Sequence, residues 1–199
     1  MFKIRASQAG KIMTNSRKKG ELSKTTQSYL QDYVKEQLYG QRKQIESKYL
    51  TKGIEVEDDA IQLAADHFGW FMAEKNEKHF HDEYFTGTPD LIVEDAVIDI
   101  KSSWDCFTFP LFEKEIPNKD YYYQLQVYMH LTGLKKAKLV YCLMDTPPDL
   151  YGANEVSYEN VDNKYRVKVF DIIYNQYEIQ ELQTRVVECR EFIKSNLTL

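Results

Sequence analysis

The chain has 199 residues, of which 43% are hydrophobic and 14% aromatic, so it can bury a substantial core, and we expect one domain over residues 1–199. No apolar run approaches the roughly 18 residues that a membrane-spanning helix needs, and the N-terminal sequence MFKIRASQAG lacks the apolar stretch of a secretory signal, which predicts a cytoplasmic protein with no membrane partner. The formal net charge of −5 argues weakly against nucleic-acid binding, because phosphate contacts come mostly from lysine and arginine.

Basic residues and cysteines are scattered through the chain. The local basic runs are solvated surface lysines or parts of a basic rim; they are Asn15–Gly20, Gly40–Gln44 and Leu134–Lys138. The cysteines lie far apart with no CxxC pair, which argues against a zinc or iron–sulfur site and predicts ordinary buried thiols; they are Cys106, Cys142 and Cys189.

The first half of the chain begins with two predicted helices. One covers residues 25–39 and starts at Ser23 or Thr25. The second is longer, covers residues 49–68 and ends before Gly69. Strand-like runs follow at 83–86, 90–93 and 96–102.

The second half continues the alternation. A helix over residues 121–131 is closed by Gly133, which suits a left-handed C-terminal cap. Pro147-Pro148 marks a loop, and residues 149–164 are expected to continue it as an ordered excursion or hairpin. The remaining elements are strands at 137–145 and 165–173 and a closing helix at 175–196. The whole pattern predicts a mixed α/β (α+β) domain whose short mixed central sheet is flanked by helices.

Polar groups occur in the stretch 86–103, TGTPDLIVEDAVIDIKSS, where a buried strand pair should be apolar. If a two-residue turn at Glu94-Asp95 joins the strands, the register places Asp90 opposite Asp99. The pairs expected between the strands are Val93 with Ala96, Ile92 with Val97, and Leu91 with Ile98. A longer loop would shift this pairing, because Glu-Asp is not a favoured hairpin dipeptide.

The same hairpin brings a lysine to the two carboxylates. Side chains alternate along a strand, so Lys101 shares the face of Asp99 while Ile98 and Ile100 point to the other side. Like charges opposite each other on a sheet are destabilising, so the two aspartates need a compensating cation or a shared proton. Mg²⁺, with Mn²⁺ as a substitute, prefers carboxylate and carbonyl oxygens and is the natural cation. The alternative is a Pro-Asp turn beside a solvated Asp-x-Lys pair.

The preceding helix offers a third carboxylate. Its acids are Glu55, Glu57, Asp58, Asp59 and Asp66. Helical spacing puts Glu57 on one face with apolar residues, namely Ile54, Ile61, Ala64 and Phe68. A carboxylate on a core face is costly unless it is paired or binds a metal, so we interpret Glu57 as a ligand, with Asp58 as the substitute if the helical phase differs by one residue. The alternative is a glutamate at the edge of the apolar stripe whose carboxylate reaches solvent.

The helix after the hairpin, NKDYYYQLQVYMHLTGL, carries polar groups on one face. Gln124 and Tyr128 are spaced i, i+4, with Tyr121 one turn before. An amide and a phenol there can position a lysine, a water or a phosphate, although tyrosines also pack helices without any such role.

In this order, these motifs resemble the PD-(D/E)xK nuclease superfamily. The set comprises Glu57, Pro89-Asp90, Asp99-Ile100-Lys101 and Gln124-x-x-x-Tyr128. The sequence is most similar to the phage lambda exonuclease and viral-recombinase branch. The features that suggest this branch are Gly53-x-x-x-Glu57, Gly87-Thr-Pro-Asp90, YYYQLQVYMHLTG and the N-terminal RASQAGKIMT. The resemblance covers about residues 5–133, and no motif matches in the C-terminal third.

The resemblance implies a restriction-endonuclease-like core and a role for each matched residue. Asp90 and Asp99 would bind Mg²⁺, Glu57 would do so directly or through water, and the Ile100 carbonyl would complete the shell. Lys101 would orient or deprotonate the attacking water. Residues implied to hold Lys101 or the substrate phosphates are Gln124, Tyr128, Arg5, Ser7 and Ser102; a guanidinium and a hydroxyl suit phosphate binding, although Arg5 and Ser7 could equally be part of a plain N-terminal segment.

The implied function is a Mg²⁺-dependent deoxyribonuclease that digests double-stranded DNA ends from 5′ to 3′ in phage or prophage recombination. It would act in the cytoplasm of a bacterial host with a single-strand annealing protein, and relatives suggest a trimeric ring. The alternatives are a structure-specific endonuclease or RecB-like nuclease of the same fold, a catalytically silent DNA-binding module, and a carboxylate metal centre for another hydrolysis.

Overall fold

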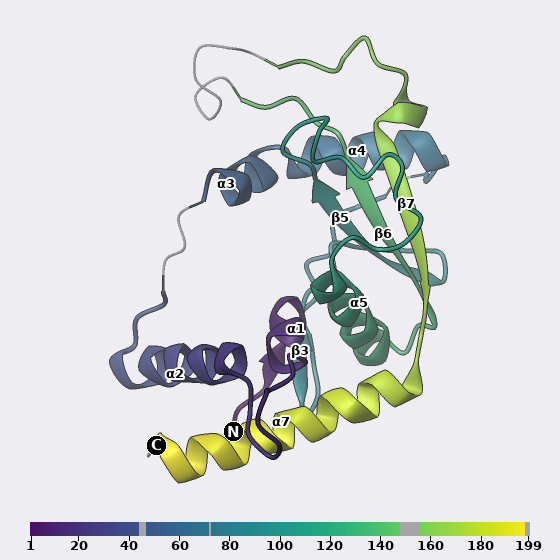
Figure 1. Ribbon diagram of the computed structural model, residues 1–199. Helices are drawn as coiled ribbons and strands as arrows, with labels where there is room; N and C mark the ends of the chain where they lie inside the picture. The colour runs from purple at the N-terminus through teal and green to yellow at the C-terminus, as the bar shows by residue number, and fades with distance from the viewer. Residues whose placement is uncertain (44–46, 72, 148–155, 198–199) are drawn as a thin grey trace.

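The computed structural model describes residues 1–43, 47–71, 73–147 and 156–197 (Figure 1). Within these residues no helix is both long enough and apolar enough to cross a membrane. Helices and strands are mixed along the chain, and they form two sheets with helices around them. This is a mixed α/β fold, as the sequence predicts.

The central sheet has four strands in the order β4-β5-β6-β7. Their bounds are Leu91–Val93, Ala96–Ser102, Lys136–Cys142 and Val167–Ile173. The β4/β5 and β6/β7 pairs are antiparallel, whereas β5 and β6 are parallel and are joined through helix α5, Lys119–Thr132. Since a parallel pair needs a long crossover, α5 is placed against the sheet. The predicted mixed sheet is confirmed.

Helices cover both faces of this sheet (Figure 1). Helix α4, Glu57–Phe68, packs on one face through apolar side chains; those it meets on the strands include Ile98, Ile100, Val140 and Cys142. Helix α5 packs on the other face, where the buried strand residues include Val97, Leu139, Tyr141 and Phe170. Because side chains alternate along β5, one strand contributes to two separate apolar clusters.

A small second sheet lies beside α5 in the order β1-β3-β2. Its strands are Ile4–Arg5, Phe85–Gly87 and Phe80–His81, and β1 pairs with β3 in parallel. The short helices η1, Ala6–Gln8, and α1, Ala9–Ile12, follow β1 and contact α5. The sequence pattern did not predict β1, β2 or these helices, because elements of two to four residues are too short to show a period.

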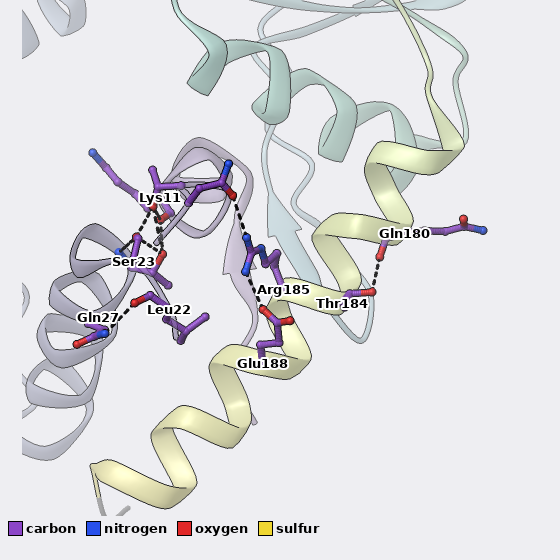
Figure 2. Close-up of polar contacts among 11 residues, drawn as sticks. Lys11, Leu22, Ser23, Gln27, Gln180, Thr184, Arg185 and Glu188 are labelled. Atoms are coloured by element: carbon purple, nitrogen blue, oxygen red, sulfur yellow. Dashed lines mark hydrogen bonds and ion pairs between the residues drawn. The ribbon is translucent and has the colours of Figure 1, made fainter. Parts of the chain in front are cut away.

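The N-terminal segment is held between α2, Lys24–Tyr39, and the long helix α7, Gln176–Asn196. Arg185 of α7 donates to Asn15 at 3.2 Å and to Glu188 at 2.9 Å, and Thr26 donates to the carbonyl of Lys11 at 2.9 Å (Figure 2). These contacts fix the segment that follows β1 to helices α2 and α7.

Helix ends follow the predicted capping residues. Ser23 begins α2 and accepts from the backbone N–H of Thr26, as expected of an N-cap. Gly69 and Gly133 end α4 and α5 in the left-handed conformation, with φ of 69° and 79°. Asn175 caps α7 by accepting from the N–H of Tyr177.

The predicted single helix over residues 49–68 is wrong. The structure has α3, Lys48–Glu55, and α4, Glu57–Phe68, separated at Val56, whose φ of −103° and ψ of 10° are not helical. Val56 is buried, whereas Ile54 is 66% exposed. The break therefore changes which residues face the core, and the expected stripe through Ile54 and Glu57 does not form.

Other expectations have mixed outcomes. Cys142 and Cys189 are buried, but Cys106 is exposed in the loop after β5, so that prediction is wrong for one thiol. Of the excursion expected at 149–164, residues 149–155 lie outside the described residues; the rest includes the short helix η2, Asn163–Tyr165. In the basic runs, several lysines pair with carboxylates; the pairs are Lys18 with Glu21, Lys43 with Asp32, Lys136 with Asp95, and Lys138 with Asp171.

Candidate active site

The hairpin of β4 and β5 has the predicted register. Its three strand pairs are Leu91 with Ile98, Ile92 with Val97, and Val93 with Ala96. Glu94 has a φ of 54°, so the two-residue turn uses the positive φ that such hairpins require. Just before β4, an oxygen of Asp90 accepts the backbone N–H of Ile100 at 2.7 Å. Asp90 thus lies beside the segment of β5 that carries Asp99.

Asp99 is buried on the α5 face of the sheet, with none of its side chain exposed. We call it and its neighbours the Asp99 cluster, which comprises Asp90, Asp99, Lys101, Gln124 and Tyr128. Its Oδ1 accepts a hydrogen bond from Gln124 Nε2 at 2.8 Å, and its Oδ2 lies 2.7 Å from Lys101 Nζ. The Asp99–Lys101 contact is an ion pair, but among the described residues Oδ2 accepts no hydrogen bond of regular geometry. A fully buried carboxylate oxygen is therefore available to a further ligand.

Charge in the Asp99 cluster shifts the pKa values of the groups around Asp99. The pKa of Asp90 is raised to about 7: burial is the largest cause and the charge of Asp99 adds to it, while Lys101 and the Ile100 N–H oppose the shift. Burial lowers the pKa of Lys101, but Asp99 and Asp90 outweigh this effect and hold it above its ordinary value. The site therefore has an ammonium that stays charged and a carboxyl group that resists ionisation.

Gln124 and Tyr128 of α5 are both buried and belong to the Asp99 cluster. Gln124 Nε2 lies 3.2 Å from the Tyr128 hydroxyl as well as bonding Asp99. Burial, followed by the charge of Asp99, raises the pKa of Tyr128, so the phenol keeps its proton. A Cβ at Gly87 would lie 2.7 Å from Tyr128 Cε1 and 3.0 Å from Ala6 Cβ, so glycine lets β3, α5 and the N-terminal segment meet here.

Glu57 lies at the start of α4, and its side chain is partly exposed to solvent. Its side chain is 33% exposed, and its carboxylate accepts from Lys75 Nζ at 2.6 Å. This corrects the expectation that Glu57 lies on the core face, and the reason is the break at Val56. The charge of Glu57 still raises the pKa of Asp90, so the structure brings Glu57 to the edge of the Asp99 cluster.

The donors around Asp90 and Asp99 are suited to a hard divalent cation. In the parts of the chain that the structure describes, no three His, Cys, Asp or Glu side chains are grouped closely enough to hold a metal ion unaided. The two aspartates nevertheless supply carboxylate oxygens, one of them buried without a regular hydrogen bond, and the adjacent backbone supplies carbonyls. A cation would also relieve the repulsion between Asp90 and Asp99, so the residues fit such an ion.

Solved structures similar to this chain include exonucleases. The phage-related exonuclease from Haemophilus somnus 129PT matches with a TM-score of 0.88 and 27% identity, over 99% of this chain and 96% of that chain. The alkaline exonuclease LHK-Exo from Laribacter hongkongensis matches with a TM-score of 0.74 and 18% identity, over 97% of this chain and 88% of that chain. Its complex with dAMP matches with a TM-score of 0.73 at 18% identity. The chain has the fold of exonucleases.

This likeness supports the nuclease resemblance seen in the motifs and confirms the predicted core. At 18% identity the LHK-Exo match shows the fold alone. No protein-family model matches the sequence, and no curated protein sequence matches it significantly. Roles for individual residues therefore depend on the geometry of this chain.

The residues expected to bind substrate phosphates lie in two parts of the chain, the N-terminal segment and the end of β5. Ala6 and Tyr128 both pack against Gly87, so the N-terminal segment borders the Asp99 cluster. Its neighbours Arg5 and Ser7 are exposed, and Arg5 lies 3.8 Å from Glu36 in a groove of about 400 Å³ between this segment and α2. Ser102, next to Lys101 on β5, is partly exposed.

Three residues at the site were not assigned a role from the sequence. Lys101 Nζ lies 5.0 Å from the ring centre of Tyr121 at the start of α5, a cation–π contact. Tyr141 pairs with Lys101 across β5 and β6, and strand alternation could have placed it on this face. Lys75, the partner of Glu57, lies in an irregular segment after α4 where no periodic signal exists.

Proposed function

We propose that this protein is a Mg²⁺-dependent deoxyribonuclease that hydrolyses phosphodiester bonds at the ends of double-stranded DNA. The observation that carries the proposal is the group formed by the buried side chains of Asp99 and Gln124 with Lys101, with Asp90 beside it. A binding module would have no need to hold two aspartates together against their repulsion. The exonuclease fold agrees with this assignment.

The carboxylates of Asp90 and Asp99 and the carbonyl of Ile100 would hold the Mg²⁺, with Mn²⁺ as a substitute; such an ion lowers the pKa of a water and neutralises a non-bridging phosphate oxygen. Glu57 would join this shell directly or through water, after release from Lys75. Gln124 fixes the orientation of Asp99 through its hydrogen bond at 2.8 Å.

Lys101 would orient the attacking water and balance the negative charge that develops on the phosphate. Its ammonium is held 2.7 Å from Asp99 and over the ring of Tyr121, so its position is defined before substrate binds. Since its pKa is raised, the charged form dominates at neutral pH, and charge balance is the better supported of its two expected roles. Tyr128, with its proton retained, would donate a hydrogen bond to the scissile phosphate or support Gln124.

We further propose digestion from 5′ to 3′ in phage-type recombination, with a single-strand annealing protein as partner and a ring-shaped homo-oligomer that retains the DNA. The N-terminal segment and the end of β5 border the Asp99 cluster. For this reason, substrate phosphates would be contacted by Arg5, Ser7 and Ser102. LHK-Exo has been solved with dAMP, a nucleoside monophosphate, which is the product class of an exonuclease.

Digestion of end-labelled DNA tests the proposal. Linear duplex carrying a label at the 5′ or the 3′ end, and a covalently closed circle, are incubated with wild type or Lys101→Ala in Mg²⁺ or EDTA. We expect Mg²⁺-dependent release of the 5′ label as mononucleotide, an intact circle, and no activity from Lys101→Ala. Cutting of the circle would instead indicate an endonuclease of the same fold, and binding without cleavage would indicate a silent module.

A further inference from the structure

A completely buried lysine lies outside the group described above. Lys52 of α3 is completely buried, and its ammonium makes four short contacts to oxygen. The acceptors are the carbonyls of Ser103 at 2.8 Å, Trp104 at 2.8 Å and Met144 at 2.7 Å, and the hydroxyl of Thr146 at 2.8 Å. An ammonium has three N–H groups, so these four oxygens fully satisfy it.

These acceptors belong to two adjacent strands at the point where both leave the sheet. Ser103 directly follows β5, which ends at Ser102, and Met144 lies two residues after β6, which ends at Cys142. After the strands end, the N–H of Ser103 donates to the carbonyl of Cys142 at 3.0 Å, and the hydroxyl of Thr146 donates to the carbonyl of Trp104 at 3.0 Å. Lys52 Nζ bonds both of these segments at once.

Helix α3 is otherwise weakly attached to the domain. Lys52 is its one buried residue, and its large apolar side chains point to solvent: Tyr49, Leu50 and Ile54 are 58%, 53% and 66% exposed. Two residues of this helix contact Trp104 at the surface: the Tyr49 ring makes an edge contact with centres 5.1 Å apart, and the Lys48 ammonium lies 4.5 Å from the Trp104 ring centre. Lys52 provides the buried attachment of α3.

Backbone hydrogen bonds carry this position forward to Glu57. The carbonyl of Lys52 accepts from the N–H of Val56 at 3.0 Å, and the carbonyl of Val56 accepts from the N–H of Ala60 at 2.9 Å. Glu57 lies between these two bonds, at the first position of α4. Its backbone is thus tied through Lys52 to the end of the strand that carries Asp99 and Lys101.

We propose that Lys52 is a positioning residue that sets Glu57 in place relative to Asp99 and Lys101 on β5. The inference rests on the proposed nuclease function, because it assigns Glu57 a part in the site. Packing alone does not explain a lysine here, since an apolar side chain of the same length would fill the space without burying a charge. Four directed acceptors define the place of one atom, which non-directional apolar contact does not do.

The test compares Lys52→Met, Lys52→Arg and Thr146→Val below the unfolding temperature of each variant. Thr146→Val removes one acceptor of Lys52 and the hydrogen bond from the Thr146 hydroxyl to the carbonyl of Trp104. We expect Lys52→Met to lower kcat about 10- to 100-fold with KM for DNA within about threefold, because misplacement by about 1 Å has such effects. Thr146→Val should have the same effect in weaker form, and Lys52→Arg should restore part of the rate. The concentration of Mg²⁺ that gives half-maximal activity should rise in Lys52→Met.

Leu182→Ala is the control for loss of stability, because Leu182 is fully buried in α7 and is not part of the site. It should unfold at lower temperature and keep its kcat. A double-mutant cycle separates positioning from general support: in a Glu57→Gln background, Lys52→Met should add little further loss. Independent, additive losses, or an unchanged kcat in Lys52→Met and Thr146→Val, would overturn the proposal.

Thermal shift with Mg²⁺ alone separates this inference from the proposed function. If the wild type binds Mg²⁺ but cleaves no DNA, the nuclease assignment fails, while loss of the Mg²⁺-induced rise in Tm in Lys52→Met, but not in Leu182→Ala, supports positioning. A rise retained by Lys52→Met overturns the Lys52 proposal alone. If the wild type shows neither cleavage nor a Mg²⁺ response, both proposals fall.

Discussion

The two faces of strand β5 differ in chemistry although they are built from alternate residues of one segment. Toward α4, Ile98 and Ile100 pack in an apolar cluster, with 1% and 9% of their surface exposed. Toward α5, the buried Asp99 forms an ion pair with the partly exposed Lys101 and accepts a hydrogen bond from Gln124. Only the apolar face gains free energy simply from leaving water, because burial of charge is costly unless it is compensated.

This contrast indicates that the two faces of the sheet have different roles. The α4 face holds β5 in place, so the α5 face can carry groups that a stable core would exclude. A buried ion pair is weak evidence for stability, since apolar residues of the same volume often serve as well. The charged face is thus better explained by chemistry than by folding, and substitutions on the two faces should have separable effects.

The largest expected effect is on activity, at the charged face. Asp99→Asn keeps the shape of the side chain and an oxygen for Gln124, but removes the charge that pairs with Lys101 and would hold Mg²⁺. We expect kcat/KM to fall by at least about 10³-fold, since metal-assisted charge stabilisation contributes several kcal/mol. Initial rates on linear duplex DNA measure this; a loss of under tenfold would show that Asp99 has no direct part in the reaction.

One residue earlier, Ile98→Ala should act on stability instead. Removal of a fully buried isoleucine side chain from the α4 face should lower the free energy of unfolding by about 2–4 kcal/mol through lost burial and a cavity. The kcat measured well below the new Tm should change little. Denaturant unfolding compares this variant with Asp99→Asn, and a large fall in kcat from Ile98→Ala in the folded state would break the division between the faces.

Lys52 is a buried lysine that lies on neither face of β5. The pH dependence of stability tests whether its ammonium stays charged. Burial lowers its pKa from 10.5 to about 8, against the opposing charges of Asp105 and Asp145. Between pH 8 and pH 10.5 the unfolded chain therefore binds more protons at this position, so stability should rise with pH across that window, by about 2 kcal/mol relative to Lys52→Met. Urea unfolding of both proteins measures the difference; a flat difference would mean that the four acceptors keep the ammonium charged.

Features with a local period were predicted well from the sequence. Alternation along residues 96–102 placed Asp99 and Lys101 on one face, and the two-residue turn gave the correct register. The i, i+4 spacing of Gln124 and Tyr128 placed both in the Asp99 cluster. In each case the relevant distance is set by a few consecutive residues in one regular element.

Features that depend on tertiary contacts were missed. The phase of Glu57 was wrong because Val56 leaves the helical conformation as its side chain enters the core, and no local residue signals that break. Lys52 looks like any helical surface lysine, since its acceptors lie about 50 and 90 residues further along the chain. The parallel pairing of β1 with β3 is likewise a long-range contact of two short segments.

The smallest expected effect is a gain in stability at the charged face. Asp90→Asn keeps an oxygen for the N–H of Ile100 but removes the repulsion with Asp99. At pH 8 without Mg²⁺ we expect the variant to be more stable than wild type by about 1 kcal/mol, or roughly 2–4 °C in Tm.

Addition of Mg²⁺ should reverse this order, because an ion bound by both aspartates stabilises only the wild type in proportion to its occupancy. Asp95→Asn is the matched control, as Asp95 is an exposed turn residue paired with Lys136, and it should leave both the Tm and the Mg²⁺ response nearly unchanged. If Asp90→Asn is less stable than wild type without Mg²⁺, the two aspartates do not oppose each other in the folded state. The charged face would then be held for stability after all, and the contrast between the two faces of β5 would need another explanation.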